Sequence, residues 1–240
     1  MGVSLSKFAN DMRLLSNLKC VDEPFQLEQT GSSAMPYKRN PMRDERLSSI
    51  TRKSRGLIAN FYDTAATQWF ERTLDDSAIR RMDIPQMFLL ADAMLILGNN
   101  ITKRKYDPKI ERPLTFYPKR LEKLLNEDLP FMTTEAILMD LVKIGYNRQE
   151  MHKIIEKNAH NTSVAMKEEG VDNDLFKRLG KDEGFPMTKE DLDSYLVDPG
   201  RYIGRAIQQT EEYLRDYVRP ILDSDERKEL IGKTITEINV

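Results

Sequence analysis

The chain has 240 residues, of which 40% are hydrophobic and 32% charged, and it can bury the core of one large domain or two small ones. No apolar run approaches the roughly 20 residues that span a bilayer, the N-terminus lacks the regions of a secretory signal, and the single cysteine, Cys20, has no partner for an internal disulfide. We therefore expect a cytoplasmic protein without membrane association, whose net charge of −2 gives no overall attraction to nucleic acid.

The first helix is expected to begin almost at Met1. Apolar side chains recur there at three- and four-residue spacing, which is typical of an amphipathic helix. These side chains are Leu5, Phe8, Met12, Leu15 and Leu18. Cys20 follows with no histidine near it in sequence to act as a base, so we expect its thiol to be passive.

Residues 31–42, Gly-Ser-Ser-Ala-Met-Pro-Tyr-Lys-Arg-Asn-Pro-Met, combine backbone freedom, paired hydroxyls and positive charge, and we call them the serine loop. The glycine permits backbone angles that other residues avoid, whereas the two prolines restrict the far side. Ser32 and Ser33 offer a proton acceptor and a hydrogen-bond donor, and Lys38 and Asn40 offer contacts for an anionic substrate. We interpret the segment as an active-site loop. An ordinary glycine-serine turn is the structural alternative.

A cationic segment continues from the loop. Between Lys38 and Arg55 there are seven lysines and arginines against two acids, Asp44 and Glu45. Such a segment attracts anions, and Arg46 joins Lys38 as a candidate for substrate contact because both accompany the serine loop. A solvated helix face is the alternative. Nucleic-acid binding is a weaker alternative, because interleaved aromatic residues are lacking.

Two long helices are expected next, as parts of a helical bundle. The first runs from Glu45 to Gln68, and the second follows a turn at residues 69–77 and reaches about Leu97. Pro85 is expected to kink the second helix, and the Gly-Asn-Asn sequence at 98–100 to end it. Three residues are candidate caps for its start: Thr73, Asp75 and Asp76.

Arg72, Ser77 and Arg81 form a second candidate cluster. Ser77 and Arg81 are four residues apart and share a helix face, and Ser77 falls in the first turn, where free amides favour an anion. The cluster therefore predicts a phosphate pocket. An exposed, capped helix with surface arginines is the alternative.

The chain is expected to be all-α and to have two pieces. Residues 1–105 would form part of a central helical bundle, residues 106–118 a connection, and residues 119–240 a C-terminal helical domain. The helices expected in that domain run from Thr133 to near Gly145, from Asn147 to near Gly170, from Thr188 onward, and from about Ile203 to Val218, before Pro220.

The two histidines, His152 and His160, are eight residues apart on one expected helix, far beyond the serine loop. We expect surface or packing roles for them. A metal pair is a weak alternative without further ligands at supporting positions, and no metal is expected.

The sequence Met-Pro-Tyr-Lys-Arg-Asn-Pro-Met at 35–42 resembles the adenylosuccinate lyase family of the fumarase/aspartase superfamily. The segment from Trp69 to Arg81 is also similar to the substrate-binding region of that family. The resemblance implies a partial long-helix bundle followed by a small helical domain. It implies elimination of fumarate from adenylosuccinate and from succinyl-aminoimidazole-carboxamide ribotide in purine synthesis, without an organic cofactor, by a homotetramer with shared active sites.

The resemblance also implies roles for single residues. Ser32 would be the general base that removes a carbon-bound proton. The substrate-binding residues would be Ser33, Lys38, Asn40, Arg46, Arg72, Ser77 and Arg81. The general-acid histidine of the family precedes the loop, and neither His152 nor His160 matches it. We therefore expect a truncated chain, which is either a C-terminal form of the enzyme or a catalytically incomplete form that associates with full-length subunits.

Overall fold

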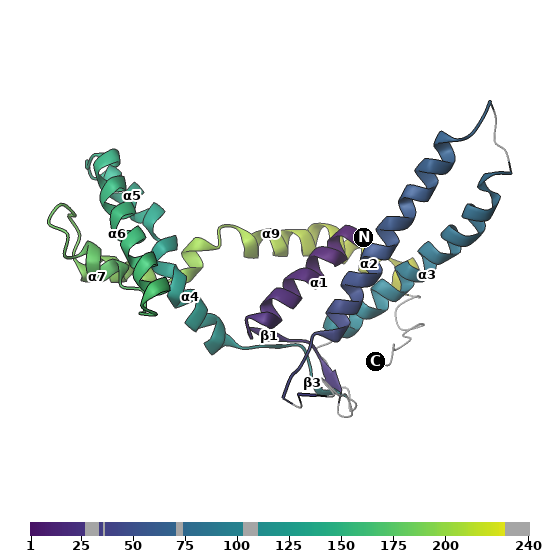
Figure 1. Cartoon of the computed structure of the whole chain (residues 1–240), viewed down its shortest axis with the longest axis horizontal. Coiled ribbons are helices and arrows are strands. Elements are labelled where there is room, and N and C mark those ends of the chain that lie inside the picture. Colours follow the sequence, from purple (N-terminus) through teal and green to yellow (C-terminus); the bar gives the residue numbers. More distant parts are fainter. Residues whose placement is uncertain (27–33, 36, 71–73, 103–109, 229–240) are drawn as a thin grey trace. The chain divides into compact units, whose positions relative to one another are not determined.

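The computed structural model of the chain describes residues 1–26, 34–35, 37–70, 74–102 and 110–228 (Figure 1). One compact unit covers Met1–Pro118, and a second begins at Lys119. The described residues are mostly helical, with short strands at the base of the first unit. The fold is therefore all-α, as the sequence predicts.

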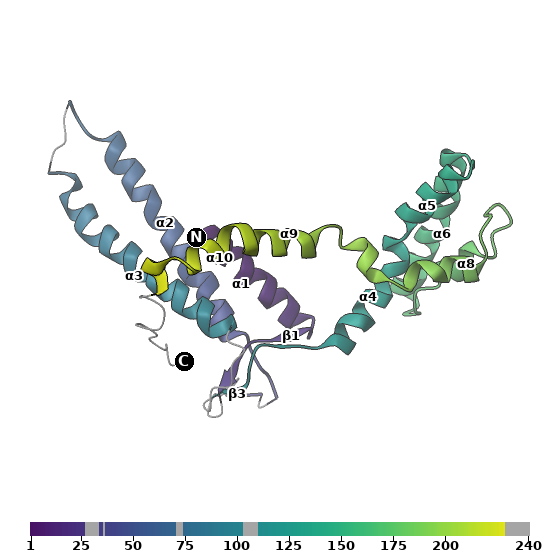
Figure 2. The ribbon, with the colours of Figure 1, turned by 180° about the vertical axis from the view of Figure 1, so that it is seen from behind.

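The first unit is a bundle of α1 (Gly2–Asn17), α2 (Met42–Ala66) and α3 (Asp76–Thr102). α2 lies between the other two, and α2 and α3 run side by side in both views (Figures 1 and 2). Burial of a large aliphatic side chain stabilises a fold by about 1.5–3 kcal/mol. The buried apolar residues of these helices are Ala9, Met12, Leu47, Leu57, Met94, Leu97 and Ile101.

The helix ends differ in part from the sequence predictions. The expected start of α1 is confirmed, whereas α2 begins at Met42 and not at Glu45. The Gly-Asn-Asn sequence at 98–100 does not end α3, which continues to Thr102. The reason is burial: Leu97 and Ile101 are fully buried on this last stretch, and a Cβ on Gly98 would meet Leu5 at 3.7 Å. Packing there outweighs the weak helix propensity of these residues.

Four short strands form two antiparallel pairs at the base of the first unit. β1 (Val21–Asp22) pairs with β4 (Thr115–Phe116), and β2 (Phe25–Gln26) pairs with β3 (Ile110–Arg112). The Tyr117 hydroxyl donates to Asp22 at 2.7 Å, next to β4. Part of the expected connection at 106–118 therefore pairs with the segment before the serine loop. Strands of two or three residues are too short to leave an alternating pattern.

The second unit contains α4 (Pro118–Met132), α5 (Thr134–Lys143), α6 (Arg148–Glu168), α7 (Leu175–Leu179) and α8 (Lys189–Asp193). Two predicted caps are confirmed. The Asn147 side chain accepts from the amides of Gln149 and Glu150, and Thr188 and Asp191 form a capping box. The core of this unit includes Ile137, Leu141, Met151, Ile155, Leu175, Phe176, Leu179 and Leu192.

The last helical stretch continues past Pro220, where the sequence predicts a stop. After the 3-10 turns Ser194–Leu196 and Pro199–Tyr202, α9 (Ala206–Tyr213) passes into a π-helical turn, Leu214–Val218. α10 (Arg219–Leu222) and α11 (Asp225–Lys228) follow. Pro220 lies in the first turn of α10, where an amide hydrogen is not needed. A π turn shifts the backbone hydrogen bonds, so the chain accommodates proline without leaving the helix.

α3 is apolar over much of its length and little buried by its own chain. By length and composition it could cross a membrane, and 17% of its most apolar window is buried. The apolar residues of α3 are interrupted by Asp83 and Asp92, so it contains no unbroken apolar run of about 20 residues. Its exposed apolar residues are Met82, Ile84, Phe88, Leu89 and Leu95.

Candidate active site

The structure describes five of the eight predicted site residues: Lys38, Asn40, Arg46, Ser77 and Arg81. Ser32, Ser33 and Arg72 lie outside the described residues, so their roles stay predictions.

The far end of the serine loop is fixed by contacts with its own backbone and with β2. The amide of Lys38 donates to the carbonyl of Met35, and the amide of Met42 donates to the carbonyl of Asn40, both at 2.9 Å. The guanidinium carbon of Arg39 lies 4.4 Å from the centre of the Phe25 ring, a cation–π contact. Lys38 is exposed and Asn40 is half-buried. A cation is thus available to solvent immediately before the first turn of α2.

Arg46 lies in the second turn of α2 and is exposed. Its neighbour Leu47 is fully buried against the bundle. α2 therefore presents Arg46 outward on the same end of the helix as the serine loop. This placement leaves its guanidinium accessible to an anion.

Ser77 and Arg81 meet at the start of α3. The Arg81 guanidinium donates to the Ser77 hydroxyl, and its Nη1 atom lies 3.5 Å from the Ser77 carbonyl. The first turn of a helix carries free amides and a partial positive charge. The expected placement of these residues on one helix face is confirmed, and it brings the Arg81 guanidinium to the first turn of α3.

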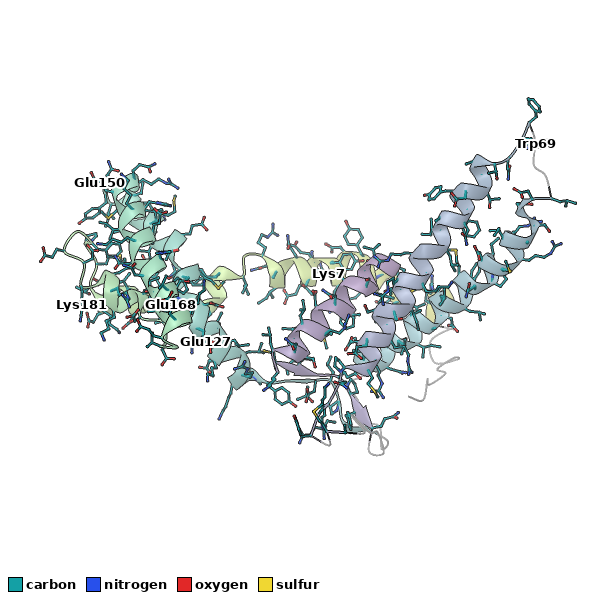
Figure 3. The ribbon with its side chains drawn as sticks, viewed as in Figure 1. Lys7, Trp69, Glu127, Glu150, Glu168 and Lys181 are labelled. Atoms are coloured by element: carbon teal, nitrogen blue, oxygen red, sulfur yellow. The ribbon has the colours of Figure 1, made fainter. Side chains whose placement is uncertain are left out.

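The two groups of candidate residues lie at opposite ends of one helical hairpin. Trp69 lies at the tip of the α2–α3 hairpin (Figure 3). α3 begins after this tip at Asp76 and carries Ser77 and Arg81, whereas α2 begins at Met42, directly after Asn40 and Pro41. α2 has 25 residues, which at 1.5 Å per residue is about 37 Å. One chain therefore does not bring Lys38 and Arg81 onto one substrate.

A buried charged cluster lies beside the serine loop. We call Glu23, Arg43 and Asp44 the carboxyl cluster, and each is at most 5% exposed. The Glu23 carboxylate accepts from the amide of Arg43 at 3.0 Å and from the amide of Asp44 at 3.1 Å. The Nη1 atom of Arg43 lies 3.5 Å from Glu23 Oε1 and also donates to the Pro24 carbonyl.

Burial changes the proton affinity of both carboxyls. It raises the pKa of Glu23, although the amides and guanidinium of this cluster act in the opposite direction. Burial, followed by the charge of Glu23, raises the pKa of Asp44 to about 8. Among the described residues, neither carboxyl oxygen of Asp44 has a hydrogen-bond donor, whereas a proton on Asp44 lets it bond to Glu23. Burial therefore favours the protonated form of Asp44, with the proton directed at Glu23.

Sequence reasoning missed this cluster because it counted Arg43 and Asp44 with the exposed charges. A signal was present in the spacing. Arg43, Leu47 and Thr51 follow at four-residue intervals, and all three are buried on the inner face of α2. Arg43 is in line with this stripe and is buried with it.

The histidines do not join the candidate site. His152 and His160 are exposed on α6, and the Nδ1 atom of His152 lies 3.8 Å from Glu156. No three histidine, cysteine or acidic side chains among the described residues are grouped to hold a metal ion. Cys20 is buried, at 1% exposure.

Two family models match the chain. "Adenylosuccinate lyase C-terminus" matches residues 130–213, and "Lyase" matches residues 1–56, which include the serine loop. The second match ends within α2, and the first covers α5 through α9 and most of the second unit.

Curated relatives match over almost the entire chain. Adenylosuccinate lyase of Saccharomyces cerevisiae is 46% identical over 90% of this chain and 43% of its own length. The Schizosaccharomyces pombe enzyme is 43% identical over 92% of this chain and 44% of its own length. The Schistosoma mansoni enzyme is 41% identical over 93% of this chain and 45% of its own length. The chain thus spans less than half the length of these relatives.

Proposed function

The chain belongs to the adenylosuccinate lyase family, and from that premise we propose that it supplies the proton-abstracting loop of a carbon–nitrogen lyase. The reaction is elimination of fumarate from adenylosuccinate and from succinyl-aminoimidazole-carboxamide ribotide in purine nucleotide synthesis. The observation that carries the proposal is the serine loop with its fixed cationic end, inside a match of 46% identity.

The proposed chemistry is a proton abstraction followed by cleavage. Ser32 takes the proton from the carbon next to the carbon–nitrogen bond, and the electron pair passes into the adjacent carboxylate. Lys38 and the amide of Asn40 stabilise the negative charge that develops there. The pair then forms the double bond of fumarate as the carbon–nitrogen bond breaks, and a general acid outside this chain's assigned residues protonates the nitrogen. Ser33 donates a hydrogen bond beside the base.

Substrate phosphate would bind at the other end of the hairpin. Ser77 and Arg81 offer a hydroxyl, a guanidinium and the first turn of α3, and Arg72 adds a second guanidinium. About 37 Å of α2 separates this end from the serine loop. A complete site then needs different ends of different chains, which supports a homotetramer with shared sites. Arg46 would contact substrate on the loop side.

The remaining elements of the proposal follow from the family. The reaction needs no organic cofactor or metal, and we place the protein in the cytoplasm. Its partners would be the nucleotide substrates, fumarate and further subunits, with neither nucleic acid nor a membrane. The apolar face of α3 would pack against helices of those subunits.

A catalytically incomplete form that associates with full-length subunits is the second candidate function. The observation that favours it is the exposed apolar surface of α3, whose Phe88 and Leu89 side chains are more than 70% exposed. In this case the chain would enter assemblies without adding a working base.

Complementation distinguishes the two functions. The chain is mixed with a full-length subunit of the S. cerevisiae relative whose own loop serine is replaced by alanine, and fumarate release is followed by absorbance. Restored release that is lost again with Ser32→Ala in this chain supports the proposed base. Co-assembly without release, seen by light scattering, supports the second candidate.

A further inference from the structure

We propose that Glu23 is a positioning residue for this elimination, because its carboxylate joins the segment before the serine loop to the start of α2 after it. The inference rests on the proposed function of Ser32. Glu23 itself does not touch the reacting atoms.

The first step of the argument is the unusual cap of α2. The residue at its N-cap position, Pro41, offers no side-chain acceptor, so the first amides of the helix need another partner. Glu23 supplies it from twenty positions earlier in the chain, with bonds to two successive amides. A buried carboxylate that accepts these bonds is a charge-assisted cap, stronger than an ordinary neutral one.

The second step is that the chain on both sides of the loop is connected to residues 21–26, which form β1, Glu23 and β2 and which we call the stem. Glu23 stands between β1 and β2, and β2 places Phe25 under the guanidinium of Arg39. The stem is in turn paired to β3 and β4. The distance between the chain before residue 27 and the chain after residue 37 is therefore set by Glu23 and by this cation–π contact. An error of about 1 Å in placing a reacting group can cost 10²-fold in rate.

The third step concerns the proton on Asp44. Its carboxyl faces Glu23 before β2, Arg13 of α1 and Arg43 of α2, so two cations oppose one anion and the burial. When Asp44 is protonated, it donates a hydrogen bond to Glu23 and does not repel it. The Glu23 carboxylate then stays in place to accept hydrogen bonds from the two amides. Ionised, it repels Glu23 in a buried setting and weakens the cap. The attachment should therefore loosen as the pH rises above the range in which Asp44 keeps its proton.

The test uses the complemented assembly described above, with three variants of this chain. Glu23→Gln removes the charge and half of the acceptor capacity at nearly constant shape. Asp44→Asn imitates the protonated acid. Asp63→Asn is the matched control, because it makes the same change at an exposed position of α2.

We expect Glu23→Gln to lower kcat by roughly 10- to 100-fold with little change in KM, since the phosphate contacts lie at the other end of the hairpin. We expect Asp44→Asn to keep kcat near neutral pH and to remove the loss of activity on the alkaline side. The proposal would be overturned if the kcat of Glu23→Gln equalled that of the parent chain. It would also be overturned if Asp44→Asn lost activity at alkaline pH to the same extent as the parent.

Amide hydrogen exchange separates this inference from the proposed function. The amides of Arg43 and Asp44 should be less protected, relative to their intrinsic exchange rates, in Glu23→Gln at constant pH and in the parent at high pH, whereas Asp63→Asn should leave their protection unchanged. Unchanged exchange in Glu23→Gln contradicts the attachment itself. Faster exchange in an assembly that releases no fumarate retains the attachment and rejects the proposed reaction, and with it the positioning role.

Discussion

At the scale of single residues, Asp44 has the most unusual environment of the carboxyls described. It is 1% exposed, yet in the sequence it stands within a run of seven cations. The nearby cations Arg13 and Arg43 lower the pKa of Asp44, but the loss of hydration on burial raises it by more. Burial thus favours a proton on Asp44, beside a Glu23 carboxylate that accepts two amides.

This environment predicts a pH dependence of stability. The pKa of Asp44 is raised from 3.8 to about 8 in the folded chain, so between these values the folded state binds more protons than the unfolded state. The free energy of unfolding should then fall as pH rises across this window and level off above it. Denaturant titrations from pH 5 to pH 9 measure it. Asp44→Asn should flatten the curve, and Asp63→Asn should not.

Arg81 supports a prediction about the division of roles within the site. Arg81→Ala should weaken binding of the nucleotide substrates by about 1.5–3 kcal/mol, because it removes a charge-assisted contact to phosphate. Binding of fumarate alone should change little. Calorimetric titration of both ligands into the complemented assembly measures the difference. Equal weakening of the two would contradict the assignment of Arg81 to phosphate.

The candidate site could be predicted from the sequence only where its chemistry follows short-range spacing. The pairing of Ser77 with Arg81 follows from four-residue spacing on a helix and is confirmed. The bond from Glu23 to the amides of Arg43 and Asp44 spans about twenty positions and depends on β1 and β2. Such a contact leaves no local pattern, because it is set by tertiary structure.

At the scale of elements, local sequence signals predicted the capped starts of α6 and α8 and the ends of α5 and α6 near Gly145 and Gly170, but not the ends of α3 and α9. Asn147 and Thr188 cap α6 and α8 through their own side chains, so the signal lies within four residues of the cap. The ends of α3 and α9 depend instead on what the helix packs against, or on a π turn before Pro220. At these two places, packing and backbone geometry keep the chain helical past the glycine, asparagine and proline residues that usually end a helix, and neither can be seen in a short sequence pattern.

The cap of α6 gives a prediction at this scale. Asn147→Ala should destabilise the chain by about 1 kcal/mol, because the amides of Gln149 and Glu150 lose their acceptor. Asn161→Ala is the matched control, since Asn161 is exposed within the same helix and alanine favours helices. Thermal unfolding of the two variants provides the comparison. If both behave alike, the Asn147 bonds contribute nothing measurable.

At the scale of the whole molecule, the apolar stripe that the sequence identifies on the first helix is not the exposed apolar surface of the structure. The stripe of Leu5, Phe8, Met12 and Leu15 lies on α1, which packs against α2 and α3 of its own chain, and Met12 is 6% exposed. Exposed apolar side chains lie instead on α3, such as Phe88 and Leu89, and along the last helical stretch, such as Ile207 and Tyr217. Periodicity identifies an apolar face but not the helix that covers it.

The chain alone is therefore predicted to self-associate through α3 and to release no fumarate. Association follows because exposed apolar side chains of this size mark a surface that packs against a partner. Replacing Phe88 and Leu89 with glutamate should return the chain to a monomer in light scattering over a concentration series. Ile144→Glu is the control, because Ile144 is 72% exposed in the second unit.

Inactivity of the chain alone follows because about 37 Å separates the two ends of the candidate site, and neither His152 nor His160 matches the family's general acid. A monodisperse monomer of the parent chain with substantial turnover would contradict both parts of this prediction.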